Sequence, residues 1–386
     1  MKWPMEKLSE VCQVNPRLPK DSDESQEVSF LAMASISEDG VLLNQETRIL
    51  GETKKGFTYF ERGDVIVAKI TPCFENGKAA YLDSLQTKIG FGSTEFHVLR
   101  PDIDRLDGKY LFYLIWNDKF RFIAERSMSG SAGQKRVPAK FLQDFSIPLP
   151  PLEEQKRIAA ILDKADAIRQ KRQEAIALAD DFLRSVFLDM FGDDISSENN
   201  VVSLGDVVTL DAPMVDPREE MYADLLHIGP DRIEKNTGRL LPALTAREEG
   251  LISKKFLFND EYVLYSKIRP YLKKVAISNF TGLCSADMYP VKPVDGKTTK
   301  EFLWMLLLSD LFDSYIKSLA ERANIPKLNR KELASFKFSL PEFNKIKIFT
   351  EVVIKTTELK NNNLSSECRL DSMFNSLSQK AFSGQL

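Results

Sequence analysis

The 386-residue sequence has two histidines, His97 and His227, and four widely separated cysteines. The cysteines form neither a CxxC pair nor a disulfide-like pattern, which fits a reducing cytoplasm. Each histidine lies beside apolar residues of the kind found in strands, so we expect both to have structural roles rather than catalytic or metal-binding ones. The sequence therefore offers no obvious metal centre.

Nucleotide-binding motifs are missing as well. The sequence contains no GxxxxGK[ST] phosphate loop and no glycine-rich fingerprint between a strand and a helix. It also lacks the Asn- or Asp-Pro-Pro-Tyr/Phe motif that amino-methyltransferases carry. Because the usual sites for a nucleoside triphosphate or a nucleotide cofactor are absent, the sequence favours a binding protein over an enzyme.

Long apolar runs are also absent. The run at residues 304–308 ends before Asp310, far short of the roughly 18 to 20 apolar residues of a membrane span. The N-terminal residues have no apolar segment of the kind that marks a secretory signal, so we expect a cytoplasmic protein that does not enter a membrane. The net charge is −3, so any binding of nucleic acid must depend on local basic patches.

A long helix is predicted for residues 151–192. Prolines at 150–151 can begin a helix without losing a needed N–H, and glutamates at 153–154 place negative charge in its first turn. Apolar residues then recur at three- or four-residue spacing until Gly192, which we expect to end the helix. A helix of about 40 residues is a rod about 60 Å long, and it needs a partner for its apolar stripe.

The partner is predicted near the C-terminus. Residues 336–343, Phe-Lys-Phe-Ser-Leu-Pro-Glu-Phe, repeat the pattern of residues 145–152, Phe-Ser-Ile-Pro-Leu-Pro-Pro-Leu, 191 positions later. A second apolar stripe of helical spacing follows over residues 342–386. Two helices of this length most simply pack on each other as a coiled-coil pair.

The repeat extends beyond the helices. Three more blocks recur in the same order at offsets of 192 to 198 residues. They pair residues 8–11 with 204–207, residues 63–72 with 259–270, and residues 109–114 with 301–306, and the last pair opens two amphipathic helices. Strand-forming runs lie within the second pair of blocks, at residues 64–69 and 262–266, and after it, at residues 95–99 and 288–291.

These features predict an α+β chain built as a pseudo-twofold internal repeat. Two mixed α/β domains are separated by two long antiparallel helices that form a coiled coil. The expected order is a domain at 1–150, a helix at 151–192, a domain at 193–341 and a helix at 342–386.

Basic residues gather in equivalent loops of the two copies, where Glu75 is the one acidic residue among them. In the first copy these loops span 69–78 and 126–140, and in the second they span 266–274 and 322–331. Arg, Lys, Asn, Gln and Ser are the side chains that bind phosphates and read base edges. A basic loop is by itself often a solvated surface, but matching loops in both copies favour DNA binding.

The residues between the first domain and its helix also match a known family. Residues 147–158, Ile-Pro-Leu-Pro-Pro-Leu-Glu-Glu-Gln-Lys-Arg-Ile, closely resemble the central conserved segment of the specificity subunits of type I restriction–modification systems. Residues 377–386, Leu-Ser-Gln-Lys-Ala-Phe-Ser-Gly-Gln-Leu, resemble their C-terminal segment. The resemblance covers the whole chain. It departs from the family at residues 341–345, Pro-Glu-Phe-Asn-Lys, where a fuller Pro-Pro-Leu-Glu-Glu-Gln is expected.

This resemblance implies a non-catalytic subunit that recognises a bipartite, asymmetric target in double-stranded DNA. Each domain would be a target-recognition domain that reads one half of the target. The helix pair would be a spacer and the docking site for two DNA-adenine methyltransferase subunits, with restriction subunits joining for cleavage. This chain would bind no cofactor itself, because S-adenosylmethionine, ATP and magnesium belong to the partner subunits.

We name the contacting residues as a hypothesis. Residues predicted to contact the first half-site are Lys69, Thr71, Lys78, Gln134, Lys135 and Arg136. Residues predicted to contact the second half-site are Lys267, Arg269, Lys273, Lys274, Arg322, Asn324 and Lys327. Arg136 and Arg269 are the predicted guanine readers, because the guanidinium fork fits O6 and N7. Partner docking is expected on the outer faces of the helices, at Glu153, Arg157, Arg169 and Arg172.

Three alternatives remain open at this point. The chain could serve a system that methylates without a restriction subunit. It could be a duplicated-domain scaffold that binds proteins and has no DNA specificity. It could be a free-standing enzyme that modifies nucleic acid, which the missing catalytic and cofactor motifs oppose.

Overall fold

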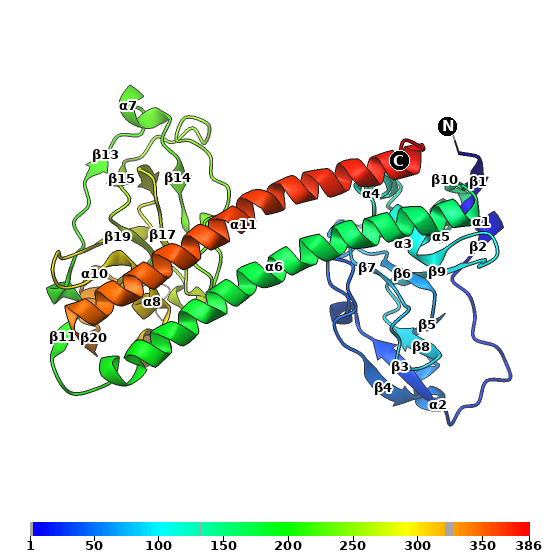
Figure 1. The fold of residues 1–386 in the computed structure, drawn as a ribbon, viewed down its shortest axis with the longest axis horizontal. Helices are drawn as coiled ribbons and strands as arrows, with labels where there is room; N and C mark the ends of the chain where they lie inside the picture. The colour runs from blue at the N-terminus through cyan, green and yellow to red at the C-terminus, as the bar shows by residue number, and fades with distance from the viewer. Residues whose placement is uncertain (1–2, 132, 321–326) are drawn as a thin grey trace. The chain divides into compact units, whose positions relative to one another are not determined.

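The protein divides into two units of similar construction, whose helices and strands are labelled in Figure 1. The computed structural model describes residues 3–131, 133–320 and 327–386, with the backbone alone at residues 320, 362–369 and 371. Unit 1 consists of Met1–Gln173 and Ser365–Leu386, and unit 2 consists of Glu174–Leu364. Each unit mixes helices with sheets, as the sequence predicts.

Unit 1 contains two four-stranded sheets. The first has the order β2-β9-β6-β7 and the second the order β4-β3-β8-β5. Their strands are β2 (Cys12–Val14), β3 (Glu27–Leu31), β4 (Glu46–Ile49), β5 (Thr58–Glu61), β6 (Val65–Ala68), β7 (Ala79–Tyr81), β8 (Ile89–Gly92) and β9 (Phe96–Pro101). All four residues of β6 are buried, because this strand is central in its sheet and covered on both faces. Strands β6 and β9 confirm the runs predicted at 64–69 and 95–99.

The helices of unit 1 pack against both sheets. They are α1 (Leu8–Val11), the 3-10 helix η1 (Met33–Ser35), α2 (Leu50–Thr53), α3 (Gly108–Trp116), α4 (Asp118–Glu125) and α5 (Ala139–Asp144). Helix α3 begins where Asp107 accepts a hydrogen bond from the backbone N–H of Tyr110, and nearly all of its residues are buried. Its apolar side chains share one core with β6, β9 and the adjoining parts of the long helices.

Unit 2 repeats this plan. Its sheets have the orders β12-β19-β16-β17 and β13-β15-β18-β14. Their strands are β12 (Val208–Thr209), β13 (Met214–Val215), β14 (His227–Ile228), β15 (Lys255–Phe258), β16 (Val263–Ser266), β17 (Val275–Ile277), β18 (Gly282–Cys284) and β19 (Met288–Pro293). The helices are η2 (Leu204–Asp206), α7 (Glu220–Ala223), η3 (Pro230–Arg232), η4 (Pro270–Leu272), α8 (Lys300–Leu308), α9 (Asp310–Ala320) and α10 (Arg330–Ala334). Strands β16 and β19 occupy the places of β6 and β9, which confirms the internal repeat.

Two short ribbons join the domains to the long helices. Strand β1 (Met5–Lys7) pairs antiparallel with β10 (Ser146–Pro148), and β11 (Val201–Ser203) pairs antiparallel with β20 (Lys337–Ser339). Strands β10 and β20 come from the repeated segments at 145–152 and 336–343, before each long helix. In both copies the chain therefore enters its long helix from the same kind of ribbon.

The long helices run antiparallel. Helix α6 (Leu152–Ile195) has 44 residues and α11 (Phe343–Ser383) has 41. The core of unit 1 takes Ile158 from the start of α6 and Phe374 from the end of α11. The core of unit 2 takes Phe191 from the end of α6 and Phe349 from the start of α11. The early residues of each helix thus pack with the late residues of the other, as the coiled-coil prediction requires.

The predicted end of the first helix is wrong by three residues. Helix α6 continues through Gly192 to Ile195. A glycine inside a helix costs about 1 kcal/mol relative to alanine. Phe191 and Ile195 are both buried in the core of unit 2, so packing favours one more turn. The second helix was expected at 342–386, but α11 ends at Ser383, and Gly384 follows it with a φ of 73°, the left-handed conformation that glycine commonly adopts after a helix. Within the described ranges, no helix combines the length and apolar character that crossing a bilayer requires.

Candidate nucleic-acid interface

Two basic loops meet at the end of β6 in unit 1. The backbone N–H of Thr71 donates to the carbonyl of Lys135 at 3.0 Å, and that of Val137 donates to the carbonyl of Lys69 at 2.9 Å. An isolated β-bridge joins Ile70 to Arg136. Loops 69–78 and 126–137 therefore form one surface, which we call the unit 1 loop pair.

The side chains of this loop pair differ in burial and in the hydrogen bonds that they make within the protein. Gln134 and Lys135 are exposed and, among the described residues, have no side-chain hydrogen bond or ion pair. Lys69 is half-buried, and the Thr71 hydroxyl donates to Glu75 Oε1 at 2.8 Å. The structure thus brings five of the six residues predicted for the first half-site together, and two of them are free to bind a ligand.

Arg136 is held by a carboxylate that the sequence analysis missed. Its Nε donates to Glu95 Oε2 at 2.9 Å and its Nη2 donates to Glu95 Oε1 at 2.8 Å. Its Nη1 donates to the carbonyl of Gln134 at 3.0 Å. The hydrogen bond from Arg136 lowers the pKa of Glu95, so this carboxylate stays ionised at neutral pH.

Unit 2 presents the same frame. The backbone N–H of Lys267 donates to the carbonyl of Asp287 at 3.0 Å, as that of Lys69 donates to Glu95 at 2.9 Å. The N–H of Leu328 donates to the carbonyl of Lys267 at 2.8 Å, and a bridge joins Ile268 to Lys327. Loops 266–274 and 327–331 form the unit 2 loop pair, so the predicted alignment of Lys69 with Lys267 is confirmed by equivalent hydrogen bonds.

The cations of the unit 2 loop pair are partly neutralised by one acid. The ammonium of Lys327 lies 3.3 Å from Asp287 Oδ1, and that of Lys267 lies 3.8 Å from the same oxygen. Lys267 also lies over the ring of Tyr289, at 5.6 Å from its centroid. Asp287 in unit 2 therefore stands where Glu95 stands in unit 1. Arg322 and Asn324, also predicted for this half-site, lie outside the described residues.

Arg269 is an exposed cation of the unit 2 loop pair. Its backbone has φ 47° and ψ 58°, the left-handed conformation that non-glycine residues seldom adopt. The next turn, η4, also ends in a left-handed residue, Lys273, whose ammonium lies 3.2 Å from Asp310 Oδ1. Within the described part of the chain, the Arg269 side chain has no hydrogen bond or ion pair. The turn thus projects one uncommitted guanidinium from the surface.

Two predicted DNA contacts are bonded inward instead. Lys78 Nζ donates to the carbonyls of Ile36 at 3.0 Å and Met33 at 3.3 Å. Lys274 Nζ donates to the carbonyl of Pro230 at 2.6 Å. Because η1 and η3 occupy equivalent places, the same lysine anchors the same 3-10 helix in both copies. These bonds favour an anchoring role for both lysines, and a DNA contact by either stays an untested prediction.

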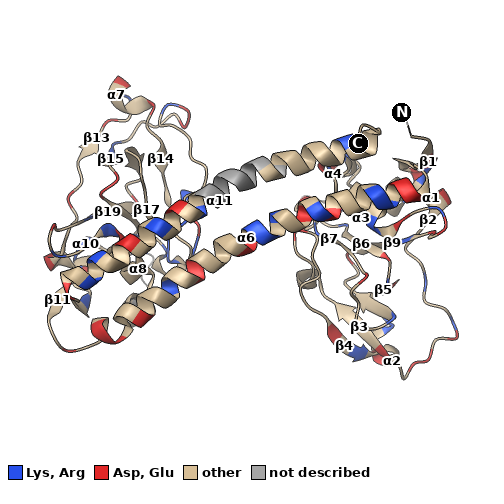
Figure 2. Ribbon diagram, in the orientation of Figure 1, with Lys and Arg blue, Asp and Glu red and all other residues tan. Residues whose placement is uncertain are grey.

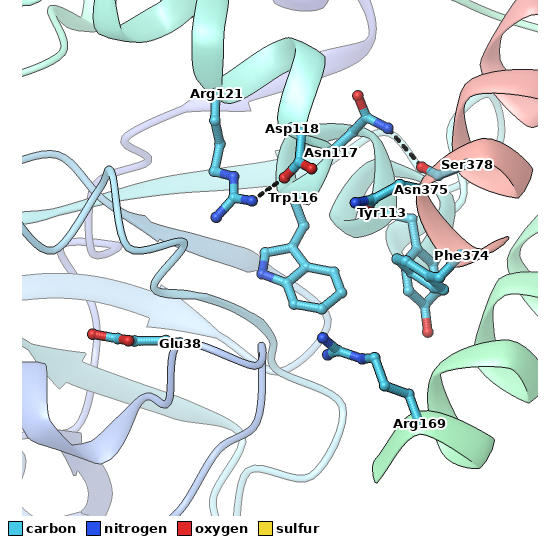
Figure 3. A pocket seen from close by; sticks show the side chains of 10 residues that line it. All are labelled: Glu38, Tyr113, Trp116, Asn117, Asp118, Arg121, Arg169, Phe374, Asn375 and Ser378. Carbon is cyan, nitrogen blue, oxygen red and sulfur yellow. Dashed lines mark hydrogen bonds and ion pairs between the residues drawn. The ribbon is translucent and has the colours of Figure 1, made fainter. Parts of the chain in front are cut away.

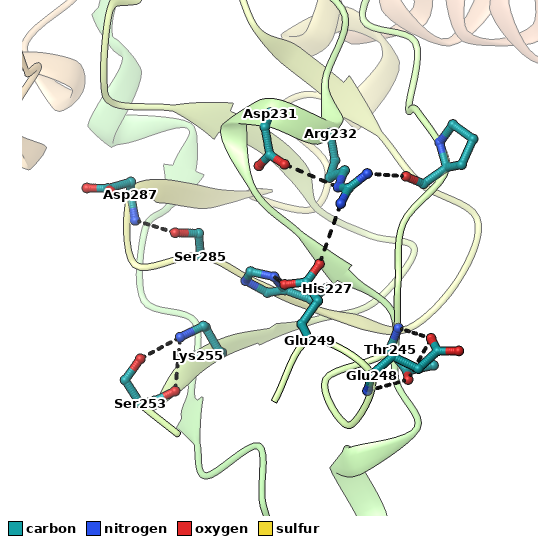
Figure 4. A network of polar contacts seen from close by, with 11 residues as sticks. His227, Asp231, Arg232, Thr245, Glu248, Glu249, Ser253, Lys255, Ser285 and Asp287 are labelled. Carbon is teal, nitrogen blue, oxygen red and sulfur yellow. Dashed lines mark hydrogen bonds and ion pairs between the residues drawn. The ribbon is translucent and has the colours of Figure 1, made fainter. Parts of the chain in front are cut away.

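Both histidines lie in local networks. His97 Nε2 is 2.8 Å from the carbonyl of Val137, and burial lowers the pKa of this histidine. Figure 4 shows His227 beside Glu249, with its Nδ1 2.8 Å from Glu249 Oε2. Arg232 approaches the other oxygen of Glu249 at 3.9 Å. Among the described residues, no group of three or more His, Cys, Asp or Glu side chains has the arrangement of a metal site.

The residues predicted to dock partners fall into two groups. Glu153 and Arg157 are exposed on the first turns of α6. Glu153 forms an ion pair with Lys156 at 2.9 Å, and Arg157 forms one with Glu154 at 2.7 Å. Arg172 is half-buried and has an interaction partner. Both signs of charge alternate along α6 in Figure 2, so this helix presents a mixed polar surface.

Arg169 does not lie on an outer face, so that expectation is wrong. Its side chain is 12% exposed and lies 3.0 Å from Asp166. Its guanidinium lies over the ring of Trp116 at 5.0 Å and over that of Phe374 at 5.7 Å. Figure 3 shows it pointing into a cavity of about 260 Å3 that these rings line. Arg169 therefore helps to pack α6, α3 and α11 together in unit 1.

The sequence carries a signal that could have found the missed carboxylates. Glu95 and Asp287 are 192 positions apart, which is an offset of the repeat, and each precedes the strand that pairs with the basic-loop strand. A search of the repeat for acids at equivalent positions would have identified them.

Comparison with known proteins agrees with this architecture. A family model described as the type I restriction modification DNA specificity domain matches residues 1–178 and 196–367. The chain is 44% identical over 164 residues to the type I restriction enzyme EcoEI specificity subunit of Escherichia coli, over 42% of this chain and 27% of that protein. It is 45% identical over 158 residues to the EcoAI specificity subunit of the same species, over 40% of this chain and 26% of that one. The matched stretch thus spans about a quarter of each relative's length.

Solved structures share the fold. The S subunit of a type I restriction–modification system from M. genitalium superposes with a TM-score of 0.59 at 14% identity, covering 98% of this chain and 96% of that one. A chain from another type I system has a TM-score of 0.54 at 19% identity, covering 100% and 98%. Because the family model matches both copies of the repeat, this chain belongs to the family of the type I restriction modification DNA specificity domain.

Proposed function

We propose that this chain is the non-catalytic DNA-recognition subunit of a type I restriction–modification system, and that each unit reads one half of a bipartite target. One observation carries the proposal: the same backbone frame holds a basic loop pair in both units, but the side chains on it differ. Unit 1 offers Gln134, Lys135 and Arg136, whereas unit 2 offers Arg269 and Lys327. A shared frame with different side chains suits a target whose two halves have different sequences.

The chemistry of the loop pairs fits reading of the major groove. Guanine presents the acceptors O6 and N7 there, which suit a guanidinium, and a glutamine amide suits adenine N6 and N7. The net charge of −3 is compatible with this role, because partner subunits can supply much of the phosphate contact while these loops supply base contacts.

The proposed partners bind the long helices. Two DNA-methyltransferase subunits dock on them, with Glu153 and Arg157 as contacts at the start of α6, and restriction subunits join for cleavage. S-adenosylmethionine, ATP and magnesium serve those subunits and not this chain. The complex acts on double-stranded DNA in the cytoplasm.

Replacement of Arg269 by alanine tests the role of the unit 2 loop pair. Loss of a bidentate guanine contact is expected to cost about 1 to 3 kcal/mol of discrimination at one base of the second half-site. The measurement is the sequence preference of methylation by the complex with its methyltransferase subunits. The first half-site is the internal control and should stay unchanged.

Two results would oppose this assignment. If Arg269→Ala leaves the rate and the sequence preference of methylation unchanged, Arg269 does not read a base. Failure of the intact complex to retain DNA at all would instead favour a protein scaffold.

A further inference from the structure

We propose that Glu95 and Asp287 are positioning residues for base recognition: Glu95 fixes the orientation of Arg136, and Asp287 restrains the position of Lys327 and Lys267. This inference rests on the proposed function, and it gives two acidic residues a role in base recognition. The carboxylates are half-exposed, with side chains 26% and 41% exposed, so they border the surface and are not core residues.

The two acids hold equivalent places in both backbone and side-chain bonding. The backbone carbonyl of each accepts the N–H of the lysine that ends the strand, Lys69 or Lys267. The carboxylate of each binds the cation that comes from the second loop, Arg136 in unit 1 and Lys327 in unit 2. One residue thus links both loops of each pair. Arg136 and Lys327, the cations of these ion pairs, also form the β-bridges to Ile70 and Ile268. We therefore infer that the ion pair helps to hold the two loops together in both copies.

The bonding of Arg136 determines which of its edges can meet a base. Glu95 occupies the edge formed by Nε and Nη2. Nη1 and Nη2 form the end of the fork and carry two N–H groups each. Nη2 donates one of its two to Glu95, and Nη1 donates one of its two to the Gln134 carbonyl, so each nitrogen keeps one N–H. Two parallel donors at that end match guanine O6 and N7. Because the guanidinium is planar, two bonds to one carboxylate also fix the plane in which those donors lie.

In unit 2 the acidic residue restrains its cations less strongly. An ammonium carries its donors on a freely rotating centre and has no plane for a carboxylate to fix. Asp287 therefore restrains the position of Lys327 and Lys267 but not a donor direction, and the separations of 3.3 and 3.8 Å are longer than the 2.8 Å of Arg136 and Glu95. The loss of Asp287 is expected to affect base preference less than the loss of Glu95.

The test is Glu95→Gln and Asp287→Asn in the full chain, each co-expressed with the methyltransferase subunit of its system in a host without methylation. Genome-wide mapping of N6-methyladenine reads both half-sites at once. Glu95→Gln is expected to raise methylation at sites with one wrong base in the first half-site by about tenfold, equivalent to about 1.4 kcal/mol of lost discrimination, and to leave the second half-site unchanged. Asp287→Asn is expected to give a smaller relaxation of the second half-site alone.

Two further variants separate positioning from a general loss of structure. Glu46→Gln breaks an ion pair of the same kind with Arg48, at 2.7 Å on the other sheet of unit 1, and should leave preference unchanged. Glu95→Gln added to Arg136→Ala should relax the first half-site no further than Arg136→Ala does, because Glu95 acts through that arginine.

The outcomes are distinct. If the wild-type complex methylates a split target and Glu95→Gln leaves preference intact, the positioning role is overturned while the proposed function stands. A switch to one different base, in place of relaxation, would overturn it by making residue 95 the reader itself. If the wild-type complex yields no split target, the proposed function has failed.

Discussion

Replacement of Phe349 by alanine is expected to lower the free energy of unfolding of unit 2 by about 3 to 5 kcal/mol, the usual range for loss of a buried aromatic ring. Phe349 lies on α11 and is fully buried. Its ring centroid is 5.5 Å from that of Phe187 and 5.4 Å from that of Phe191, both on α6. The two α6 rings also contact Phe302 of α8, so the cavity would open where three helices meet. Urea unfolding followed by circular dichroism measures the loss.

The neighbouring residue is a matched control. Ile348 is 59% exposed on the same turn of α11, and its replacement by alanine should change stability by no more than about 0.5 kcal/mol. If Phe349→Ala were as mild as Ile348→Ala, the packing of α11 against α6 in unit 2 would be refuted.

Replacement of Asp64 by alanine is expected to destabilise unit 1 by about 3 kcal/mol, because it removes one partner of a largely buried ion pair. The Asp64 side chain is 2% exposed and accepts two hydrogen bonds from Arg100, both at 2.8 Å. It also accepts the backbone N–H of Glu61 at 2.7 Å. Loss of one partner of a buried ion pair usually costs about 3 to 5 kcal/mol. We expect the lower end of that range, since Arg100 is 23% exposed and water can reach it. Thermal unfolding of the full chain measures the effect.

A double variant identifies the cause of that loss. Asp64→Ala combined with Arg100→Met removes both charges of this pair and should recover part of the stability, because no guanidinium is then left without the two hydrogen bonds that Asp64 accepts and with only its contact to Glu61, at 2.6 Å. No recovery in the double variant would assign the cost to the hydrogen bond from Glu61 and not to the ion pair.

The repeat made most of the fold predictable. Three features recur in the sequence at nearly constant offsets: the segments at 145–152 and 336–343, the basic-loop strands and the long helices. The structure has them in equivalent places in the two copies. The end of α6 was less predictable, because Gly192 favours termination locally while Phe191 and Ile195 gain burial from a core that the sequence alone does not reveal.

The candidate site was predictable as a set of loops and less so as individual side chains. Composition placed Lys69, Lys135 and Arg269 in basic loops, and within each unit the structure joins the basic loops in a pair. Composition does not tell whether a long side chain points outward. Lys274 turns back to a backbone carbonyl, and Arg169 turns into an aromatic cavity. Bonds of this kind depend on partners far away in the sequence.

We propose that the two units read different halves of one target. A genome-wide map of N6-methyladenine, in a methylation-free host that expresses this chain with the methyltransferase subunit of its system, tests this most directly. We expect one split motif with a fixed gap. Substitutions in the unit 1 loop pair should change one half of it, and substitutions in the unit 2 loop pair should change the other. An unmethylated genome despite a stable complex, or a motif in which both halves change after substitution in one unit, would contradict it.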